Sequence, residues 1–310
     1  MTSYFEIHYT NLFVNKFGLV KEIAGRLETY LMNRRAFIKL IAVSGALLVA
    51  SRKLFPSKKD LPFQVVDYHV HPCDRFPREQ VKARSEELGI PFGTVPHPAP
   101  RYGKISTDED LIDYVEQTHA LGLYAGLQPV NPGWYEMFSE RARSCLDYVL
   151  MDALEIPDGE GGYHITWRDN FELPWETSKF MDRYLDFYEN VIANEKIQIL
   201  ASPTFLPRCI RDEYEELWTA ERMNRIIKSA VENGVALEIN SGYQIPDAKF
   251  VELAKRKGAK FSFGTNSWRA HRAGNLTYSI DIAKSCGLKA SDIFTLNKGS
   301  HDKAKSSQSS

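Results

Sequence analysis

Hydrophobic and polar positions follow two periods along the chain, and each period predicts one kind of element. Short apolar runs between Gly, Pro or polar residues predict buried strands, whereas apolar positions three and four residues apart predict amphipathic helices. A first strand begins at residue 64 and ends at a pair of histidines. The other predicted strands cover residues 123–127, 148–154, 197–201, 235–239 and 261–263. The predicted helices cover residues 78–88, 107–122, 179–193, 213–233, 247–257 and 276–286.

Strands that alternate with helices predict a parallel sheet covered by helices. No Gly-x-Gly-x-x-Gly follows the first strand, so a closed barrel is favoured over a dinucleotide-binding sheet. We therefore expect an α/β fold, a distorted TIM-like (β/α)7 barrel, over residues 61–297. Residues 72–106 are rich in Pro, Gly and charge, and we expect a long loop with one helix there. Residues 298–310 have little apolar content and are expected to be a disordered tail.

Composition limits the classes of function. The 310-residue chain is 43% hydrophobic, which suffices for one large domain. Its formal net charge of -1 gives no indication of a nucleic acid partner. The four cysteines are scattered without a Cys-x-x-Cys pair, so neither a zinc ribbon nor a thioredoxin-type site is expected.

Residues 1–60 are expected to form an N-terminal extension, a signal and a linker. Asn33-Arg34-Arg35-Ala36-Phe37-Ile38-Lys39 precedes an apolar run over residues 40–50 that is too short for an ordinary membrane span. This pattern predicts recognition by the twin-arginine export machinery, although an amphipathic or buried helix is an alternative. The protein is then expected in the periplasm or, through an uncleaved signal, on the outer face of the cytoplasmic membrane. Met32 directly precedes the motif and is a candidate start.

The candidate chemistry lies at the strand ends. Asp67, His69 and His71 point to one side of the first strand, and the two imidazoles are suited to binding a metal or to hydrogen bonding in a core. In barrels of parallel strands, catalytic groups gather at the carboxyl ends. Further candidates at such ends are Asp152, Glu155, Glu238 and Asn266. For Glu238, a buried hydrogen bond that orients a loop is the alternative to metal binding.

Over residues 63–297 the chain resembles the polymerase and histidinol phosphatase (PHP) superfamily. The similarity rests on Asp67-Tyr68-His69-Val70-His71, on residues 236–243 and on residues 260–266. It implies a distorted seven-stranded barrel of the PHP type, which in many members holds up to three metal ions and hydrolyses phosphoesters. The sequence departs from the family at several ligand positions, which here hold Gln128, Leu154, Ser202, Asn266 and Trp268.

These departures disfavour a three-metal cluster, because neutral amides offset the charge of several cations poorly. The resemblance then implies one divalent ion, zinc or manganese, bound by His69 and His71. Asp152, Glu155, Glu238 or Asn266 would complete the ligands, and a bound water would attack the substrate. Arg208, Trp268 and Arg269 are the candidate substrate contacts.

Three functions follow as hypotheses. The first is an exported metal-dependent hydrolase, most plausibly a phosphoesterase that acts on a small, phosphorylated molecule. The second is a PHP-like barrel without catalysis that binds a ligand or partner at the former active site. The third is a hydrolase of another class, such as an amidase or lactonase, which an aromatic pocket without a basic rim would favour.

Overall fold

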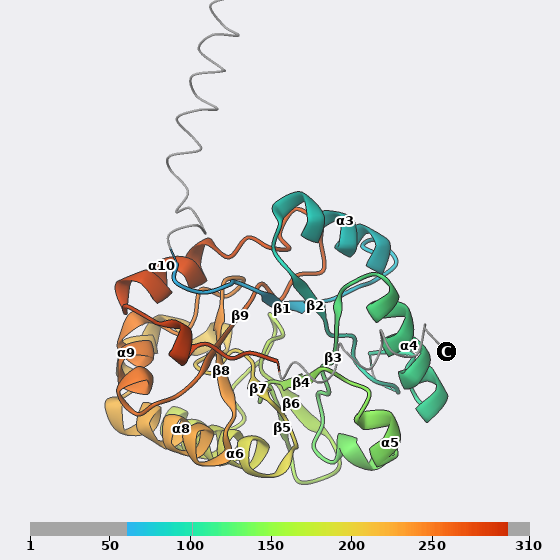
Figure 1. The fold of residues 1–310 in the computed structure, drawn as a ribbon. Coiled ribbons are helices and arrows are strands. Elements are labelled where there is room, and N and C mark those ends of the chain that lie inside the picture. Colours follow the sequence, from blue (N-terminus) through green and yellow to red (C-terminus); the bar gives the residue numbers. More distant parts are fainter. Residues whose placement is uncertain (1–60, 101, 297–310) are drawn as a thin grey trace, which may run out of the picture. The chain divides into compact units, whose positions relative to one another are not determined.

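A computed structural model describes residues 61–100 and 102–296. Seven parallel strands occupy the centre of this region (Figure 1). In their order in the sheet, they are β1 (Asp67–Val70), β2 (Phe92–Thr94), β3 (Tyr124–Leu127), β4 (Tyr148–Met151), β7 (Ile199–Leu200), β8 (Ala236–Asn240) and β9 (Phe261–Gly264). The sheet order follows the chain order, as the predicted strand and helix alternation requires.

The sheet curls until its two edges nearly meet. Val70 and Ser267 form a parallel bridge between β1 and the segment after β9. The backbone N–H of His71 donates to the carbonyl of Ser267 at 2.8 Å, and Ser267 N–H donates to the carbonyl of His69 at 3.2 Å. The fold is therefore a TIM-like (β/α)7 barrel, which confirms the predicted fold class.

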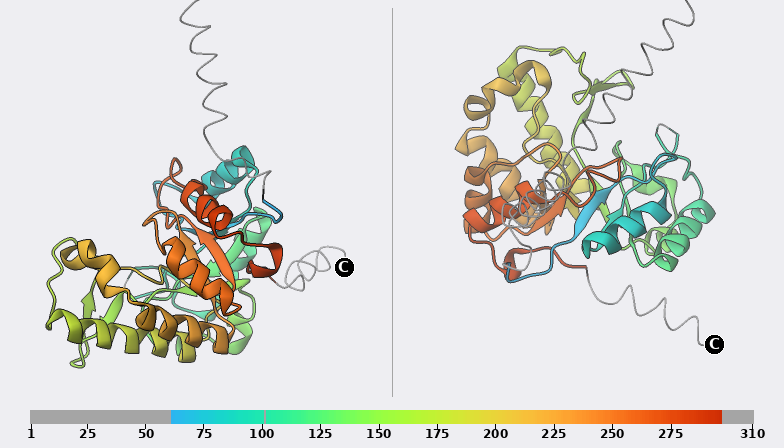
Figure 2. Two further views of the ribbon diagram at one scale, coloured as in Figure 1. Left: turned by 90° about the vertical axis from the view of Figure 1, so that its left-hand side faces the viewer. Right: turned by 90° about the horizontal axis from the view of Figure 1, so that it is seen from above.

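Helices surround the barrel. They are α3 (Arg78–Leu88), α4 (Asp108–Ala120), α5 (Glu140–Arg143), α6 (Thr177–Asn194), α7 (Tyr214–Leu217), α8 (Ala220–Asn233), α9 (Ala248–Arg256) and α10 (Thr277–Ser285), with 3-10 turns η2 (Trp134–Met137), η3 (Arg208–Glu213) and η4 (Ala290–Asp292). Thr107 and Asp110 form the capping box that starts α4. Figure 2 shows α6 and α8 side by side. No helix in the described ranges combines the length and apolar character that a membrane crossing needs.

The structure corrects the predicted elements at three places. The expected loop over residues 72–106 contains β2, whose three residues are too few to show a period. A hairpin of β5 (Glu155–Pro157) and β6 (Tyr163–Ile165) follows the fourth barrel strand. The helix expected over residues 213–233 is divided into α7 and α8. The Thr219 side chain accepts a hydrogen bond from Arg222 N–H and so caps the start of α8.

Tyr148 fills the interior of the barrel beneath the strand ends. Its ring occupies the space that side chains at Gly93 and Gly126 would need, and its hydroxyl donates to the carbonyl of Tyr68 at 2.6 Å. This close packing gives the polar groups above it a rigid floor. The predicted extension over residues 1–60, its export signal and the predicted tail over residues 298–310 lie outside the described residues.

Candidate functional site

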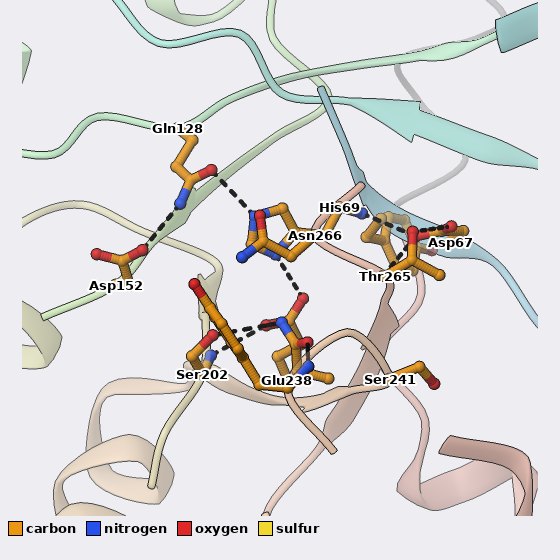
Figure 3. Close-up of polar contacts among 12 residues, drawn as sticks. Asp67, His69, Gln128, Asp152, Ser202, Glu238, Ser241, Thr265 and Asn266 are labelled. Atoms are coloured by element: carbon orange, nitrogen blue, oxygen red, sulfur yellow. Dashed lines mark hydrogen bonds and ion pairs between the residues drawn. The ribbon is translucent and has the colours of Figure 1, made fainter. Parts of the chain in front are cut away.

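The carboxyl ends of the strands bring five of the predicted polar side chains to one opening of the barrel. His69 and His71 come from the end of β1, Glu238 from β8, and Asp152 and Asn266 from the turns after β4 and β9. Figure 3 shows His69 between Glu238 and Gln128, with a hydrogen bond to each. The structure therefore places these five residues at the carboxyl ends of the strands.

A chain of hydrogen bonds runs through four buried side chains. His69 Nδ1 lies 2.7 Å from Glu238 Oε1, and His69 Nε2 lies 3.0 Å from Gln128 Oε1. Gln128 Nε2 donates to Asp152 Oδ2 at 3.0 Å. Because the Gln128 amide gives its donor to Asp152, its oxygen faces His69, so His69 Nε2 donates. Both ring nitrogens of His69 are thus engaged within the protein.

Burial and charge act against each other in this chain. Burial alone would lower the pKa of His69, but the charge and hydrogen bond of Glu238, together with Asp152, leave it raised. Burial raises the pKa of Asp152 to about 6, although the Leu154 N–H bonds its carboxylate and favours the charged form. Asp152 therefore titrates near neutral pH, which is uncommon for an aspartate and typical of functional sites.

Glu238 is fixed from three sides. Its second oxygen, Oε2, accepts from Ser202 N–H at 3.0 Å and from Asn240 Nδ2 at 2.9 Å. Gly264 of β9, which pairs with Asn240 of β8, leaves room for this carboxylate, since a Cβ there would lie 2.6 Å from His69 Cβ and would collide with Glu238. Glu238 thus orients His69 and the Ser202 turn, and this is the alternative role that the sequence left open.

Asp67 has a structural role beneath the site. Its carboxylate accepts from Thr265 Oγ1 at 2.7 Å, from Thr265 N–H at 3.0 Å and from Gly274 N–H at 2.9 Å. These bonds fasten β1 to the segment that follows β9, where the barrel closes. Burial raises the pKa of Asp67 despite these donors.

His71 lies under an aromatic cover. Its Nε2 bonds Asn266 Oδ1 at 3.1 Å, and the Trp268 ring stacks on it with centroids 4.0 Å apart. The His97 ring lies 5.0 Å from His71 on the same side of the site. Burial, with the nearby His97 and His69, lowers the pKa of His71 well below its usual value, so this ring is neutral at pH 7.

His97 is the site residue that the sequence analysis missed. It follows β2 and bonds the Gln128 carbonyl through Nδ1 at 2.8 Å. Burial lowers its pKa to about 4. The missing signal was β2 itself, because recognising Phe92–Thr94 as a strand places His97 at a carboxyl end with the other candidates.

Glu155 lies at the edge of the site and connects two aromatic residues. Tyr102 OH donates to Glu155 Oε1 at 2.8 Å, and Trp167 Nε1 donates to the same oxygen at 3.3 Å. The Tyr102 ring in turn lies 5.6 Å from the His97 ring. Glu155 therefore positions two aromatic side chains at the edge of the site. It is not part of the chain of hydrogen bonds that runs through His69.

The two predicted arginines do not enter the hydrogen-bonded centre. Arg208 is exposed in η3 and pairs with Asp169 at 3.6 Å. Arg269 is exposed after β9, and its backbone N–H contacts Ser267 Oγ at 3.3 Å. Trp268, the third predicted substrate contact, covers His71 as described above.

The donor set does not fit the divalent ion that the sequence led us to expect. Among residues 61–100 and 102–296, no three His, Cys, Asp or Glu side chains are arranged to hold a metal ion. His69 has no free ring nitrogen, because Glu238 and Gln128 use both. Metal ligation by nitrogen requires a lone pair, so His69 could bind an ion only after this chain opened.

No family model matches the sequence, and no curated protein matches it. Among solved structures, the chain is similar to histidinol phosphate phosphatase from Lactococcus lactis complexed with zinc, L-histidinol and phosphate. The TM-score is 0.58 at 17% identity, over 76% of this chain and 98% of that one.

Two further structures are less similar. The β-mannanase of Thermomonospora fusca has a TM-score of 0.39 at 14% identity, over 73% of this chain and 76% of that one. An HpcH/HpaI aldolase from Desulfitobacterium hafniense has a TM-score of 0.36 at 11% identity, over 73% and 93%. The comparisons thus show the fold that the chain shares with the phosphatase.

Proposed function

We propose that the protein is a PHP-type barrel that binds a small molecule at the carboxyl ends of its strands and works without a resident metal cluster. The observation that carries this proposal is the engagement of His69, whose two ring nitrogens bond Glu238 and Gln128. Gln128 and Asn266 supply neutral oxygens where the resemblance implies carboxylate ligands. A histidine whose two ring nitrogens are both engaged within the protein has little to gain from a cation.

Elemental analysis of the purified full chain by mass spectrometry tests the first part of this proposal. We expect no stoichiometric metal, and no rise in the melting temperature when zinc or manganese is added. Bound metal that disappears in His71→Ala but persists in His164→Gln would overturn the proposal. His164 is a suitable control because it lies on the β5–β6 hairpin against Trp175.

Thermal denaturation with a panel of small molecules, sorted into anions, cations and neutral compounds, tests the second part. A ligand that stabilises the wild type and fails to stabilise Trp268→Ala would support binding at this opening. If every compound acts equally on wild type and variant, the opening does not bind the panel and the proposal fails.

A metal-dependent phosphoesterase is the second candidate, and one comparison favours it. The phosphatase with the same fold was solved with zinc, L-histidinol and phosphate. In that case His69 and His71, whose rings lie 5.0 Å apart, would belong to the metal site, and Arg269 and Arg208 would serve the phosphoryl group. Phosphomonoester hydrolysis that requires added zinc or manganese and is lost in His71→Ala would favour this candidate over the first.

A further inference from the structure

A surface pocket of about 440 Å³ lies between the β5–β6 hairpin and α6, apart from the strand-end site. Its lining residues are Ile156, Pro157, Trp175, Arg183, Asp186 and Phe187. Ile156 directly follows Glu155 in β5, and successive side chains of a strand point to opposite faces. The pocket therefore lies on the face of the hairpin opposite to the one where Glu155 bonds Tyr102.

The pocket combines an apolar floor with an aromatic wall. Ile156 and Phe187 are buried side chains of the hydrophobic core. Trp175 is half-buried, and the His164 ring meets it edge-on, with centroids 5.0 Å apart at an interplanar angle of 80°. A pocket of this volume, lined by apolar groups and a few polar ones, is typical of sites for small organic molecules.

The cation of this pocket is Arg183, whose side chain is exposed. Its guanidinium carbon lies 4.4 Å from the centroid of the Trp175 ring, so a cation–π contact holds the group beside the pocket. Within the part of the chain that the structure describes, this guanidinium has no ion pair and no hydrogen bond. A guanidinium that lies over an aromatic ring remains able to donate its N–H groups to a planar anion.

The acidic neighbours of Arg183 on α6 are engaged by another helix. Asp186, which also lines the pocket, bonds Arg225 of α8 at 2.8 Å. Asp182 pairs with Arg222 of α8 at 3.8 Å. These ion pairs offset the two carboxylates, whereas the positive charge of Arg183 is not offset in this way. Electrostatic complementarity therefore favours an anion at Arg183.

We propose that this pocket binds a small organic carboxylate, with its carboxylate group on the Arg183 guanidinium and its apolar body against Ile156 and Phe187. This site is separate from the strand-end opening, so the inference goes beyond the proposed function. The planar fork of arginine matches the two oxygens of a carboxylate. The apolar floor favours an organic body over a fully polar anion, because contact with it removes apolar surface from water. An ammonium ligand fits less well, since it would meet both Arg183 and Arg225.

Fluorine NMR of the full chain labelled with fluorotryptophan tests this inference. Trp175→Phe and Trp268→Phe assign the resonances that report on the pocket and on the strand-end opening. The ligands are benzoate, its neutral isostere benzamide, and acetate, which has the carboxylate without the apolar body. At low salt we expect benzoate to shift the Trp175 resonance with a dissociation constant of about 1 mM, and the other two compounds to bind about tenfold more weakly.

Variants of two arginines identify the group that recognises the charge. Arg183→Gln should weaken benzoate binding about tenfold, and Arg183→Lys should weaken it less, because lysine keeps the charge but lacks the planar fork. Arg211→Gln is the matched control and should leave binding unchanged. Arg211 is likewise exposed and lies over an aromatic ring, that of Phe205, at 5.8 Å, but it does not line the pocket.

Several results would contradict the inference. Equal binding of benzoate and benzamide, or benzoate binding that Arg183→Gln does not change, would show that Arg183 does not recognise the carboxylate. Equal binding of benzoate and acetate would show that the apolar floor does not contribute. A Trp175 resonance that does not move at benzoate concentrations up to about 30 mM would exclude this ligand class. Benzoate that shifts the Trp268 resonance and not that of Trp175 would refute this inference while supporting small-molecule binding at the strand ends.

Discussion

Replacing Glu238 by leucine tests the hydrogen-bonded centre most directly. Glu238 accepts three buried donors, from His69 Nδ1, Ser202 N–H and Asn240 Nδ2. Glu238→Leu keeps a side chain of similar volume but removes every acceptor, so all three donors lose this carboxylate. A buried donor without a partner costs roughly 1–3 kcal/mol, and removing one partner of a buried ion pair costs roughly 3–5 kcal/mol.

These contributions overlap, so we expect a loss of about 4 kcal/mol in the free energy of unfolding. For a domain of this size, the melting temperature should fall by about 8–16 °C. Folding should survive, since domains of this kind are stable by roughly 5–15 kcal/mol. Urea denaturation of the full chain, monitored by tryptophan fluorescence, measures this loss in the free energy of unfolding. The dependence of that free energy on urea concentration should stay the same in the wild type and the variant.

Glu238→Gln is the matched variant. Its oxygen can accept from Ser202 and Asn240, while its amide donates to His69 Nδ1, because the opposite nitrogen of that ring already donates to Gln128. Every polar group then keeps a partner, so the loss should be about 1 kcal/mol. If the leucine and glutamine variants are equally unstable, or if the leucine variant loses less than about 1 kcal/mol, the described network does not hold this centre.

Three further predictions concern other parts of the chain. Burial raises the pKa of Asp152 to about 6, so the folded state holds this proton more tightly than the unfolded chain. Stability should therefore fall as pH rises from about 4 to 7, and Asp152→Asn should remove that part of the slope in denaturation measured across this range. Gly264→Ala should lose about 2 kcal/mol by urea denaturation, because the new Cβ meets His69 and Glu238; an unchanged midpoint would contradict this. Changing Arg34 and Arg35 together to lysine should keep the full chain out of the periplasm in cell fractionation, and export of the variant would refute twin-arginine recognition.

The strand ends could be predicted because parallel topology leaves few alternatives. Once apolar runs alternate with helical segments, the carboxyl ends must meet at one side of the sheet. His69, Asp152 and Glu238 could therefore be grouped although 169 positions separate the first from the last. The contacts between them could not be predicted, since spacing along the chain does not determine which oxygen faces which nitrogen.

The misses have local causes. β2 has three residues, and its neighbours Ile90 and Pro91 obscure any alternation, so His97 appeared to lie in a loop. The helix expected over residues 213–233 has continuous helical periodicity, yet Thr219 caps a new helix within it. Whether a threonine side chain bonds to the backbone and starts a new helix depends on local geometry. The periodicity of apolar positions carries no information about that geometry.

The two amides at the site give the histidines and Asp152 neutral hydrogen-bond partners. A carboxylate at position 128 could accept from His69 but could not donate to Asp152, so two negative groups would face each other. Gln128 accepts on one side and donates on the other, which joins His69 and Asp152 in one continuous chain. Asn266 likewise gives His71 an acceptor without adding charge. The substitutions that weaken a metal site are thus the same ones that give His69, His71 and Asp152 neutral hydrogen-bond partners.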